Sequence, residues 1–360
     1  MDDCVDRVGA ATFVSKFDLL KGYWQVPLTK RAKELSAFVT PDNFLQYNVM
    51  PFGVRNAPAT FQRLINHVLA GMPGCEAYLD DVVLFSSTWQ EHLEQIRELF
   101  QRFSSANLTV NLAKCEFGKA TVTYLGKVVG RGQVRPVGAK VEAICTFSVP
   151  SNRQELRRFL GMVGYYRGFC QNFATVVTPL TNLLSSKVPF QWTEASQQAF
   201  EAAKALLSSA PVLAAPRFEE PFRLAVDASD YGAGAVLLQL GSDGVEHPVC
   251  YFSRKFNRHQ RVYSTVEKEA LALVMAVQYF EVYLGSTSDY ITVYTDHNPL
   301  VFIARMRNSN QRIMLQPYTP AVSFTHKIYS RSREHYCRCS LQSVNNLCLV
   351  TCILFVPQIS

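Results

Sequence analysis

Two adjacent aspartates, Asp80 and Asp81, lie in the middle of the apolar stretch CEAYLDDVVLF. The residues before the pair, Tyr78 and Leu79, and the apolar run at 82–85 predict a β-hairpin with its turn at Asp80-Asp81. The simplest interpretation is an ordinary turn, because aspartate tolerates turn geometry well. The alternative is a metal site, since like charges this close to a core stay ionised together only where a cation neutralises them.

A second carboxylate stands in a similar context earlier in the chain. Asp18, in SKFDLLKGYWQVPL, follows an apolar strand start at residues 13–17 and precedes Gly22, Tyr23 and Trp24. Carboxylates at the ends of two neighbouring strands could share a pair of divalent ions about 4 Å apart, the arrangement used for in-line phosphoryl transfer. We therefore expect Asp18 and Asp80 to converge on divalent metal ions, Mg²⁺ or Mn²⁺.

Five stretches of the chain occur in an order that matches a known family. They are FDLLKGYWQVPL, SAFVTPDNFLQYNVMPFGVRNAPATFQRLI, YLDDVVLFS, NLAKCEFGKATVTYLGKVV and LRRFLGMVGYYRGFCQNFATVVTPLTNLL. Over residues 1–316 the chain resembles the reverse transcriptase region of gypsy-type long-terminal-repeat retrotransposon Pol polyproteins. The resemblance implies that Asp18 and Asp80 bind the polymerase metals, with Asp81 beside them in a supporting role. It also implies that Tyr23 stacks under the incoming sugar and screens out a 2′-hydroxyl.

A loop at residues 49–53 precedes the helix predicted from NAPATFQRLINHVLAGM. Asn56 can cap this helix, and Pro58 suits its first turn. From the residues alone, a capped surface helix is the simpler interpretation. The resemblance implies instead that the loop and helix hold the templating strand and the deoxynucleoside triphosphate, with Gly53, Asn56, Pro58 and Gln62 forming that wall. By the same resemblance Lys114 lies near the triphosphate, although alone it would pass for a solvated charge.

Two amphipathic helices are also predicted. The stretch TWQEHLEQIRELFQRFSSANL has one apolar face, formed by Leu93, Ile96, Leu99, Phe100 and Phe103. The stretch SNRQELRRFLGMVGYYRGF predicts a helix capped by Ser151, with the apolar stripe Leu156, Phe159, Leu160 and Val163. This second helix resembles the polymerase thumb, in which Arg157 and Arg158 would follow the phosphates of a bound duplex. A basic solvated helix face is the alternative for both arginines.

A second set of carboxylates follows a proline-containing linker, AAPRFEEPF. Asp227 ends a predicted strand, Glu269 lies near the start of a predicted helix, and Asp296 ends another strand. This order resembles the ribonuclease H domain that follows reverse transcriptase in these elements. The resemblance implies two metals held by Asp227, Glu269 and Asp296, which activate water against the RNA strand of an RNA–DNA hybrid. A lone strand-end aspartate is usually a turn former, and we expect Asp230, Glu267 and His297 to be structural or solvated.

Composition and charge set broader limits. The chain has 360 residues, 48% of them hydrophobic, and a net charge of +7. It should therefore fold into two or three packed domains, and its mild basic excess is compatible with a polyanionic partner. The start, MDDCVDRVGA, has no apolar signal region, and six cysteines are scattered singly before residue 300. These features predict an intracellular protein, cytoplasmic or nuclear and not secreted, with reduced thiols and no membrane partner.

We predict an α+β or α/β fold, a right-hand polymerase palm and thumb followed by a ribonuclease H-like mixed sheet with helices. The expected domains are a palm with partial fingers at 1–148, thumb and connection helices at 149–214, an incomplete ribonuclease H-like domain at 215–316, and a divergent tail at 317–360. The family's first finger strands have no counterpart here, so we expect an N-terminally truncated reverse transcriptase.

The tail departs from the family after Gln316. Gypsy-type ribonuclease H domains end in a segment like GRENIIADALSR, whose aspartate is the fourth metal ligand, whereas this chain reads SREHYCRCSLQS. Removing one base at the Glu334 codon lets the following codons spell that family segment, which predicts a frameshifted C-terminus. The alternative is a zinc site of Cys337, Cys339, Cys348 and Cys352, whose spacing is not that of a common zinc motif.

The functional expectation is a retrotransposon RNA-directed DNA polymerase with ribonuclease H. Such a chain is a nucleotidyltransferase and an endonuclease that uses Mg²⁺ or Mn²⁺ for two-metal phosphoryl transfer. The missing parts predict that this activity is impaired here. Its expected partners are a primed RNA or DNA template, an RNA–DNA hybrid and deoxynucleoside triphosphates. The alternative is a catalytically inactive transposon relic that at most binds nucleic acid.

Overall fold

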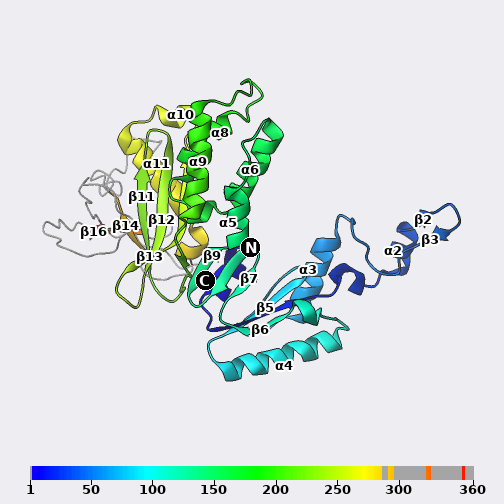
Figure 1. Ribbon diagram of the computed structural model, residues 1–360. Helices are drawn as coiled ribbons and strands as arrows, with labels where there is room; N and C mark the ends of the chain where they lie inside the picture. The colour runs from blue at the N-terminus through cyan, green and yellow to red at the C-terminus, as the bar shows by residue number, and fades with distance from the viewer. Residues whose placement is uncertain (1, 286–290, 296–321, 326–350, 353–360) are drawn as a thin grey trace. The chain divides into compact units, whose positions relative to one another are not determined.

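The computed structural model describes residues 2–285, 291–295, 322–325 and 351–352 (Figure 1). The chain forms two compact units, Met1–Val137 and Gly138–Ser360. The domain boundaries predicted at 148, 214 and 316 stay predictions. None of the described helices is long and apolar enough to cross a membrane. The six cysteines before residue 300 all carry free thiols.

The first unit is built on an antiparallel sheet with the strand order β4-β5-β1-β6. Its strands are β1 (Phe13–Asp18), β4 (Cys75–Tyr78), β5 (Asp81–Ser86) and β6 (Glu116–Lys119). In the β1–β5 register Asp18 lies directly opposite Asp81, and Ser15 lies opposite Leu84. Because side chains alternate along a strand, Ser15 and Phe17 point to one face of the sheet, and Lys16 and Asp18 point to the other.

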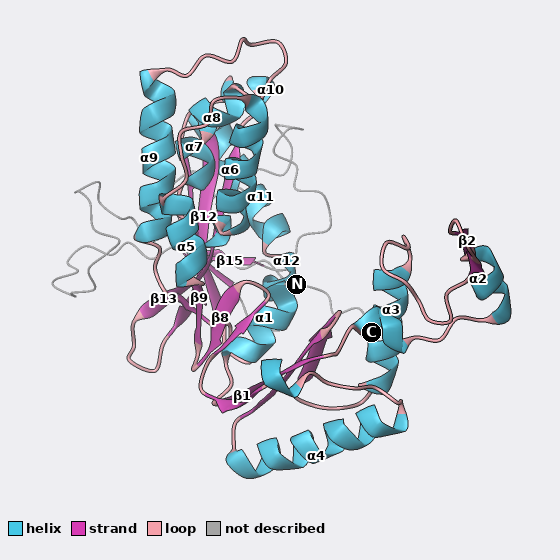
Figure 2. Ribbon diagram, turned by 45° about the vertical axis from the view of Figure 1, so that its right-hand side comes forward, coloured by secondary structure: helices cyan, strands magenta, loops and turns pink. Residues whose placement is uncertain are grey.

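Two helices, α3 (Ala57–Val68) and α4 (Trp89–Ser105), cover the Phe17 face of this sheet (Figure 2). The shared core contains Phe17, Val82 and Leu84 from the sheet, Phe61 and Ile65 from α3, and Leu99 and Phe103 from α4. The buried face of α4 is shifted from the predicted one: His92 and Gln95 are buried, whereas Phe100 is 36% exposed. The buried polar residues of α4 therefore need hydrogen-bond partners.

His92 finds those partners on two strands. Its Nε2 lies 2.7 Å from Ser15 Oγ, and its Nδ1 lies 2.9 Å from Ser86 Oγ. The Ser86 hydroxyl donates to the Thr88 carbonyl and the Gly118 N–H donates to Ser15 Oγ. We therefore assign the proton to Nδ1, which donates to Ser86, while Nε2 accepts from the Ser15 hydroxyl. Burial lowers the pKa of His92, so the histidine is neutral in this network.

The remaining elements of the first unit lie outside this sheet. They are α1 (Asp2–Gly9), η1 (Gly22–Gln25), α2 (Lys30–Leu35), β2 (Phe38–Val39), β3 (Phe44–Leu45), η2 (Leu112–Lys114), β7 (Val122–Tyr124), β8 (Lys127–Gly130) and β9 (Gln133–Pro136). Strands β7, β8 and β9 form an antiparallel meander. Both views show α2, β2 and β3 projecting away from the sheet of this unit (Figures 1 and 2).

The second unit begins with a group of helices. They are α5 (Gly138–Cys145), α6 (Arg153–Tyr165), η3 (Arg167–Phe169), α7 (Phe173–Val176), α8 (Thr178–Asn182) and α9 (Glu194–Ser208). The predicted stripe on α6 is largely confirmed, since Leu156, Phe159 and Val163 are buried. The predicted cap is wrong by one residue. Asn152, not Ser151, accepts the Glu155 N–H, and Ser151 donates to the Glu155 carboxylate instead.

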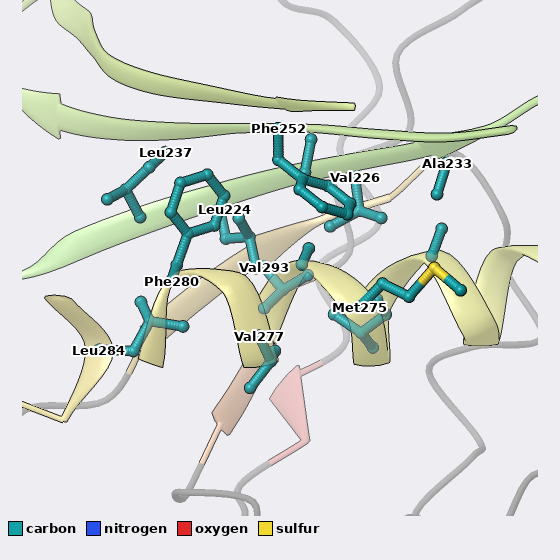
Figure 3. Packing of buried hydrophobic residues seen from close by; sticks show 14 of the residues in the cluster. Leu224, Val226, Ala233, Leu237, Phe252, Met275, Val277, Phe280, Leu284 and Val293 are labelled. Atoms are coloured by element: carbon teal, nitrogen blue, oxygen red, sulfur yellow. The ribbon is translucent and has the colours of Figure 1, made fainter. Parts of the chain in front are cut away.

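A mixed sheet with the order β13-β12-β11-β14-β15-β16 follows. The bounds are β10 (Leu213–Ala214), β11 (Phe222–Ala228), β12 (Gly232–Leu240), β13 (Glu246–Lys255), α10 (Arg258–Arg261), α11 (Thr265–Tyr279), α12 (Glu281–Leu284), β14 (Ile291–Tyr294), β15 (Val322–Thr325) and β16 (Thr351–Cys352). Strands β11 and β12 are antiparallel, and β11 and β14 are parallel. Figure 3 shows Phe280 reaching from the end of α11 toward Leu224 and Leu237, which closes one hydrophobic core.

Candidate active sites

The hairpin β4–β5 holds the adjacent aspartates, but its turn lies one residue earlier than predicted. Tyr78 pairs with Asp81, so the two turn residues are Leu79 and Asp80, and Asp81 is the first residue of β5. Leu79 adopts a left-handed conformation with φ of 54°, which is uncommon for a leucine and costs backbone strain. The Leu19 N–H donates to the Asp80 carbonyl at 2.9 Å and ties this turn to the end of β1.

Gln62 of α3 holds the other side of the same turn. Its Oε1 accepts the Leu79 N–H at 2.8 Å, and its Nε2 donates to the Ala77 carbonyl at 3.0 Å. The side chain predicted to line the nucleotide wall therefore also fixes the hairpin that carries Asp80. A glutamine suits this task because one planar amide both donates and accepts.

The other predicted wall residues lie around the start of α3. Gly53 is exposed with φ of +88°, and Pro58 is exposed in the first turn of the helix. Asn56 occupies the N-cap position, but its side chain makes no capping hydrogen bond. The predicted cap is thus correct in position and wrong in interaction.

Asp80 is the least compensated carboxylate of this group. Its Oδ1 is buried and has no hydrogen-bond partner. Burial, and then the charges of Asp18 and Asp81, raise the pKa of Asp80. Gly22 makes this position possible, because a Cβ there would overlap Asp80 Oδ1 and lie 2.8 Å from the Phe61 ring.

Each of the other two aspartates faces a lysine. Lys114 Nζ lies 3.5 Å from both carboxylate oxygens of Asp18, and its side chain is 65% exposed. Lys16 Nζ lies 3.1 Å from Asp81 Oδ1, and its side chain is only 19% exposed. The sequence prediction placed Lys114 near the triphosphate, and the structure places it beside a predicted metal ligand.

Tyr23 lies between this cluster and α3. Its ring packs against Phe52 at 5.3 Å and edge-on to Phe61 at 5.7 Å between centroids. Burial, and then the Asp80 charge, raise the pKa of the Tyr23 hydroxyl, which is therefore protonated at neutral pH. A half-buried ring fixed by two aromatic neighbours presents a rigid apolar surface beside the aspartates.

The donor chemistry of this cluster fits a hard divalent cation such as Mg²⁺, which takes carboxylate oxygens. Within the described part of the chain, no group of three or more histidine, cysteine, aspartate or glutamate side chains already stands in a metal-holding arrangement. The buried Asp80 Oδ1 without a hydrogen-bond partner is nevertheless the kind of atom that a metal ion satisfies. Asp18 and Asp80 are thus the residues of the first unit that could hold such a cation.

The second unit brings together two of the three carboxylates predicted there. Asp227 lies at the penultimate position of β11 and is exposed. Glu269, in the second turn of α11, is 4% exposed, and its Oε1 accepts the Ala228 N–H at 3.2 Å. The capping box between Ser264 and Glu267 starts α11 at the residue that places Glu269 beside the end of β11. Asp296 lies outside the described residues.

The neighbours expected to be structural in the second unit do have structural partners. Asp230 accepts a hydrogen bond from Lys268 at 2.7 Å, and this bond is the first cause that lowers the pKa of Asp230. Glu267 belongs to the capping box. Several predicted features lie outside the described residues. They are His297, three of the four cysteines considered as a zinc site (Cys337, Cys339 and Cys348), and the segment of the predicted frameshift. Cys352 is described only as part of β16.

The thumb-like helix α6 presents Arg157 and Arg158 to solvent. Within the part of the chain that the structure describes, neither guanidinium makes a hydrogen bond or an ion pair. Arg153 is different, because it donates to the carbonyls of Leu183 and Ser185 at 3.1 and 3.3 Å. The two predicted duplex-binding arginines are therefore available to an external anion.

Three residues of the first unit were missed by the sequence analysis. They are Lys16, His92 and Gln25, whose side chain bridges the backbone of Leu20 and Thr109. Lys16 carried a weak signal, since it lies two residues before Asp18 on the same face of a predicted strand. His92 and Gln25 carried none, because each joins a segment far away in the sequence, at Ser15 and Thr109 respectively.

Two family models match the chain. Residues 2–129 match the reverse transcriptase (RNA-dependent DNA polymerase) family, and residues 192–292 match the RNase H-like domain found in reverse transcriptase. By their descriptions, both indicate an enzyme.

Curated relatives agree with these matches. The retrovirus-related Pol polyprotein from transposon 297 of Drosophila melanogaster is 37% identical over 316 residues, which cover 87% of this chain and 29% of the relative. That from transposon opus of the same fly is 38% identical over 319 residues, covering 85% and 32%. The Tf2-3 polyprotein of Schizosaccharomyces pombe is 34% identical over 313 residues, covering 86% and 23%. The chain thus spans less than a third of the length of these relatives.

Solved structures share the fold. A foamy viral protease-reverse transcriptase in complex with dsDNA superposes with a TM-score of 0.78 at 22% identity, over 90% of this chain and 70% of that one. The same kind of protein in complex with an RNA/DNA hybrid gives 0.74 at 21% identity, over 96% and 48%. The predicted fold class is confirmed. The chain is thus similar over residues 2–129 to the reverse transcriptase family, over residues 192–292 to the RNase H-like domain found in reverse transcriptase, and over most of its length to the Pol polyproteins of transposons.

Proposed function

We propose that this chain is the reverse transcriptase and ribonuclease H region of a gypsy-type retrotransposon Pol polyprotein. In this proposal the first unit extends a primer on an RNA or DNA template with deoxynucleoside triphosphates. One observation carries the assignment. Asp80 holds a buried carboxylate oxygen without a hydrogen-bond partner at the tip of a hairpin, next to Asp18 and Asp81, and such an arrangement is costly unless it serves a cation.

Asp18 and Asp80 would hold the divalent ions, Mg²⁺ or Mn²⁺. When bound, these ions stabilise the attacking and leaving oxygens of an in-line phosphoryl transfer. The protein's own contribution is to fix the two carboxylates before the substrate arrives. Gln62 and Leu19 hold the turn of Asp80 by its backbone, and the antiparallel register holds Asp18. Preorganised charges of this kind need no rearrangement during the reaction.

The nucleotide would lie beside the same cluster. Tyr23 offers a fixed aromatic surface to its sugar, and its packing on Phe52 and Phe61 keeps the ring from yielding to a 2′-hydroxyl. Lys114 is mostly exposed and only 3.5 Å from Asp18, so it can turn toward a triphosphate. Gly53, Asn56 and Pro58 would form the template side of this wall.

The second unit would cleave the RNA strand of an RNA–DNA hybrid. Support comes from Glu269, a buried carboxylate positioned against the backbone next to Asp227, and from the fold that this chain shares with a reverse transcriptase solved with such a hybrid. Asp296 is the third proposed ligand. Arg157 and Arg158 of α6 would contact duplex phosphates.

Primer extension by the full 360-residue chain tests the polymerase proposal. The wild-type chain should extend a primed template with Mg²⁺ or Mn²⁺, and Asp80→Asn should reduce the rate about a thousandfold, because the metal contributes several kcal/mol to the transition state. Asp243→Asn, in an exposed turn of the second unit, is the matched control and should keep the wild-type rate. A chain that binds primed template but does not extend it would favour the alternative of a relic that only binds nucleic acid.

A further inference from the structure

The three aspartates of the first unit are not equivalent in the charges that surround them. Asp81 has Lys16 at 3.1 Å, Asp18 has Lys114 at 3.5 Å, and Asp80 has a buried oxygen without a hydrogen-bond partner. Among the described residues, the adjacent Asp80 and Asp81 thus differ in whether a lysine forms a direct ion pair with the carboxylate. This difference decides which of them needs an added cation.

The two lysines are also held differently. Lys114 is 65% exposed and equidistant from both oxygens of Asp18, which describes a loose contact that solvent or an anion can displace. Lys16 is 19% exposed, and besides Asp81 Oδ1 its ammonium donates to the Thr123 carbonyl at 3.3 Å. This second acceptor restrains the ammonium of Lys16. The contact of Lys16 with Asp81 is therefore held more firmly than that of Lys114 with Asp18.

The sheet register explains why Lys16 reaches Asp81 and not the neighbouring carboxylate. Lys16 lies opposite Val83, and Asp18 lies opposite Asp81. Lys16 and Asp81 are therefore diagonal neighbours on one face, a pair that a long side chain can join. Asp80, in the turn, is outside this ladder.

We propose that Lys16 is a positioning residue that pairs permanently with Asp81 and keeps Asp81 out of the metal-binding set. The metal ions are then left to Asp18 and Asp80. This inference rests on the proposed function, because it concerns the metal site of the polymerase. It assigns a role to a residue that no motif singled out, and it explains how two consecutive aspartates can serve different purposes.

A double-mutant cycle that removes the charges of Lys16 and Asp81, singly and together, tests the inference. The full chain is used with Asp227→Asn and Glu269→Gln, so that titration calorimetry with Mn²⁺ reports the first unit, and Asp18→Asn identifies the binding that belongs there. Lys16→Met should strengthen this binding about tenfold, and Asp81→Asn should weaken it about tenfold, since each changes one unit charge close to the ion. The double variant should return to the parent affinity within about twofold, because the pair is removed as a whole.

Controls separate charge from fold. Lys16→Arg keeps the charge and should keep the parent affinity. Lys119→Met, at an exposed position on the neighbouring strand β6, should leave the affinity unchanged. Thermal unfolding of each variant verifies that the first unit is folded, and the double variant carries the test if Lys16→Met alone is unstable.

Two results would overturn the inference alone. A double variant that binds Mn²⁺ as weakly as Asp81→Asn would make Asp81 a metal ligand, and an unchanged affinity in Lys16→Met would remove Lys16 from the site. If no Mn²⁺ binding were sensitive to Asp18→Asn, the metal assignment of the proposed function would fail, and this inference with it.

Discussion

In the first unit Asp18 and Asp81 lie opposite each other on paired strands, whereas in the second unit Asp227 is on a strand and Glu269 is on a helix packed against the sheet. The first arrangement follows from sheet register and places three aspartates together with two lysines. The second depends on how α11 docks, and a backbone N–H, that of Ala228, holds Glu269. Carboxylates can therefore be brought together in two ways. In the first unit strand pairing does so and lysines lie beside them, and in the second unit helix packing does so and a backbone N–H holds the glutamate.

The largest expected effect separates the two sites. Glu269→Gln removes the charge but keeps an oxygen that can accept the Ala228 N–H, so the fold should be retained. Hybrid cleavage by the full chain should fall about a thousandfold, as expected if Glu269 is a metal ligand as proposed, and primer extension should stay at the wild-type rate. The two rates are measured on the same preparation with a labelled RNA–DNA hybrid and a primed template. A parallel loss of both activities would show that the sites do not work separately.

The first site also depends on the absence of a side chain at Gly22, which leaves room for the Asp80 carboxylate. Gly22→Ala places a methyl group against Asp80 Oδ1 and the Phe61 ring, so Asp80 must move. We expect primer extension to fall about a hundredfold and stability to drop by about 1–3 kcal/mol, the usual cost of overpacking. Gly138→Ala, where an added Cβ meets nothing within 4 Å, is the matched control. Wild-type extension by Gly22→Ala would mean that the position of Asp80 is unimportant.

The His92 network makes stability of the first unit depend on pH. An unfolded histidine has a pKa of about 6.5, and burial lowers the pKa of His92 in the folded chain. Its contribution to stability is therefore fully present above the unfolded value and is lost as the pH falls through the folded value, by at most about 1.4 kcal/mol per pH unit. Urea unfolding of wild type and His92→Gln, compared from about pH 7 to about pH 5, measures this difference.

Asp80 makes an opposite contribution to the pH dependence of stability. Asp80 has a raised pKa, so it favours the folded state as the pH falls and opposes the histidine. Only the difference in slope between wild type and His92→Gln is therefore informative. His67→Gln, at an exposed position on α3, should not change the slope. An equal slope in wild type and His92→Gln would contradict a neutral, buried His92.

The smallest expected effect concerns the exposed arginines of α6 in the second unit. Replacing Arg157 and Arg158 with alanine should lower the slope of log affinity against log salt for an RNA–DNA hybrid by about one to two units, if both contact phosphates. Binding is measured by fluorescence anisotropy over about 50–200 mM salt. Arg97→Ala is the control. Arg97 is an exposed residue of α4, the helix that covers the Phe17 face of the first sheet, and its replacement should leave the slope unchanged. No change in the double variant would leave these arginines as a solvated face.

The parts of the molecule that sequence could predict are those with local patterns. The strand before Asp18, the hairpin at Asp80 and the apolar stripe of α6 depend on residues close together in the chain. The errors were local ambiguities. Ser151 and Asn152 are both good caps, and only the structure shows that Asn152 accepts the Glu155 N–H. A leucine is a poor candidate for a left-handed turn, so the turn was placed one residue late.

The rest depends on contacts between distant segments. His92 and Gln95 have the polarity of a solvated helix face, and nothing in α4 reveals that Ser15 and Ser86 will receive His92. Lys16 resembles any charge on a half-exposed strand until the register brings it beside Asp81. The position of Glu269 follows from the docking of α11, and only the family resemblance indicated its role.

Consecutive residues of β1 serve opposite faces, and this has a consequence for how the chain reaches its fold. Ser15 enters the His92 network on the helix side, and Lys16 meets Asp81 on the other side. A strand paired one residue out of register would exchange them, burying an ammonium ion against the core helices and leaving a hydroxyl to face the carboxylate. A register-shifted pairing loses both interactions at once, so it is less stable than the native pairing. Errors in strand pairing at this position should therefore be short-lived.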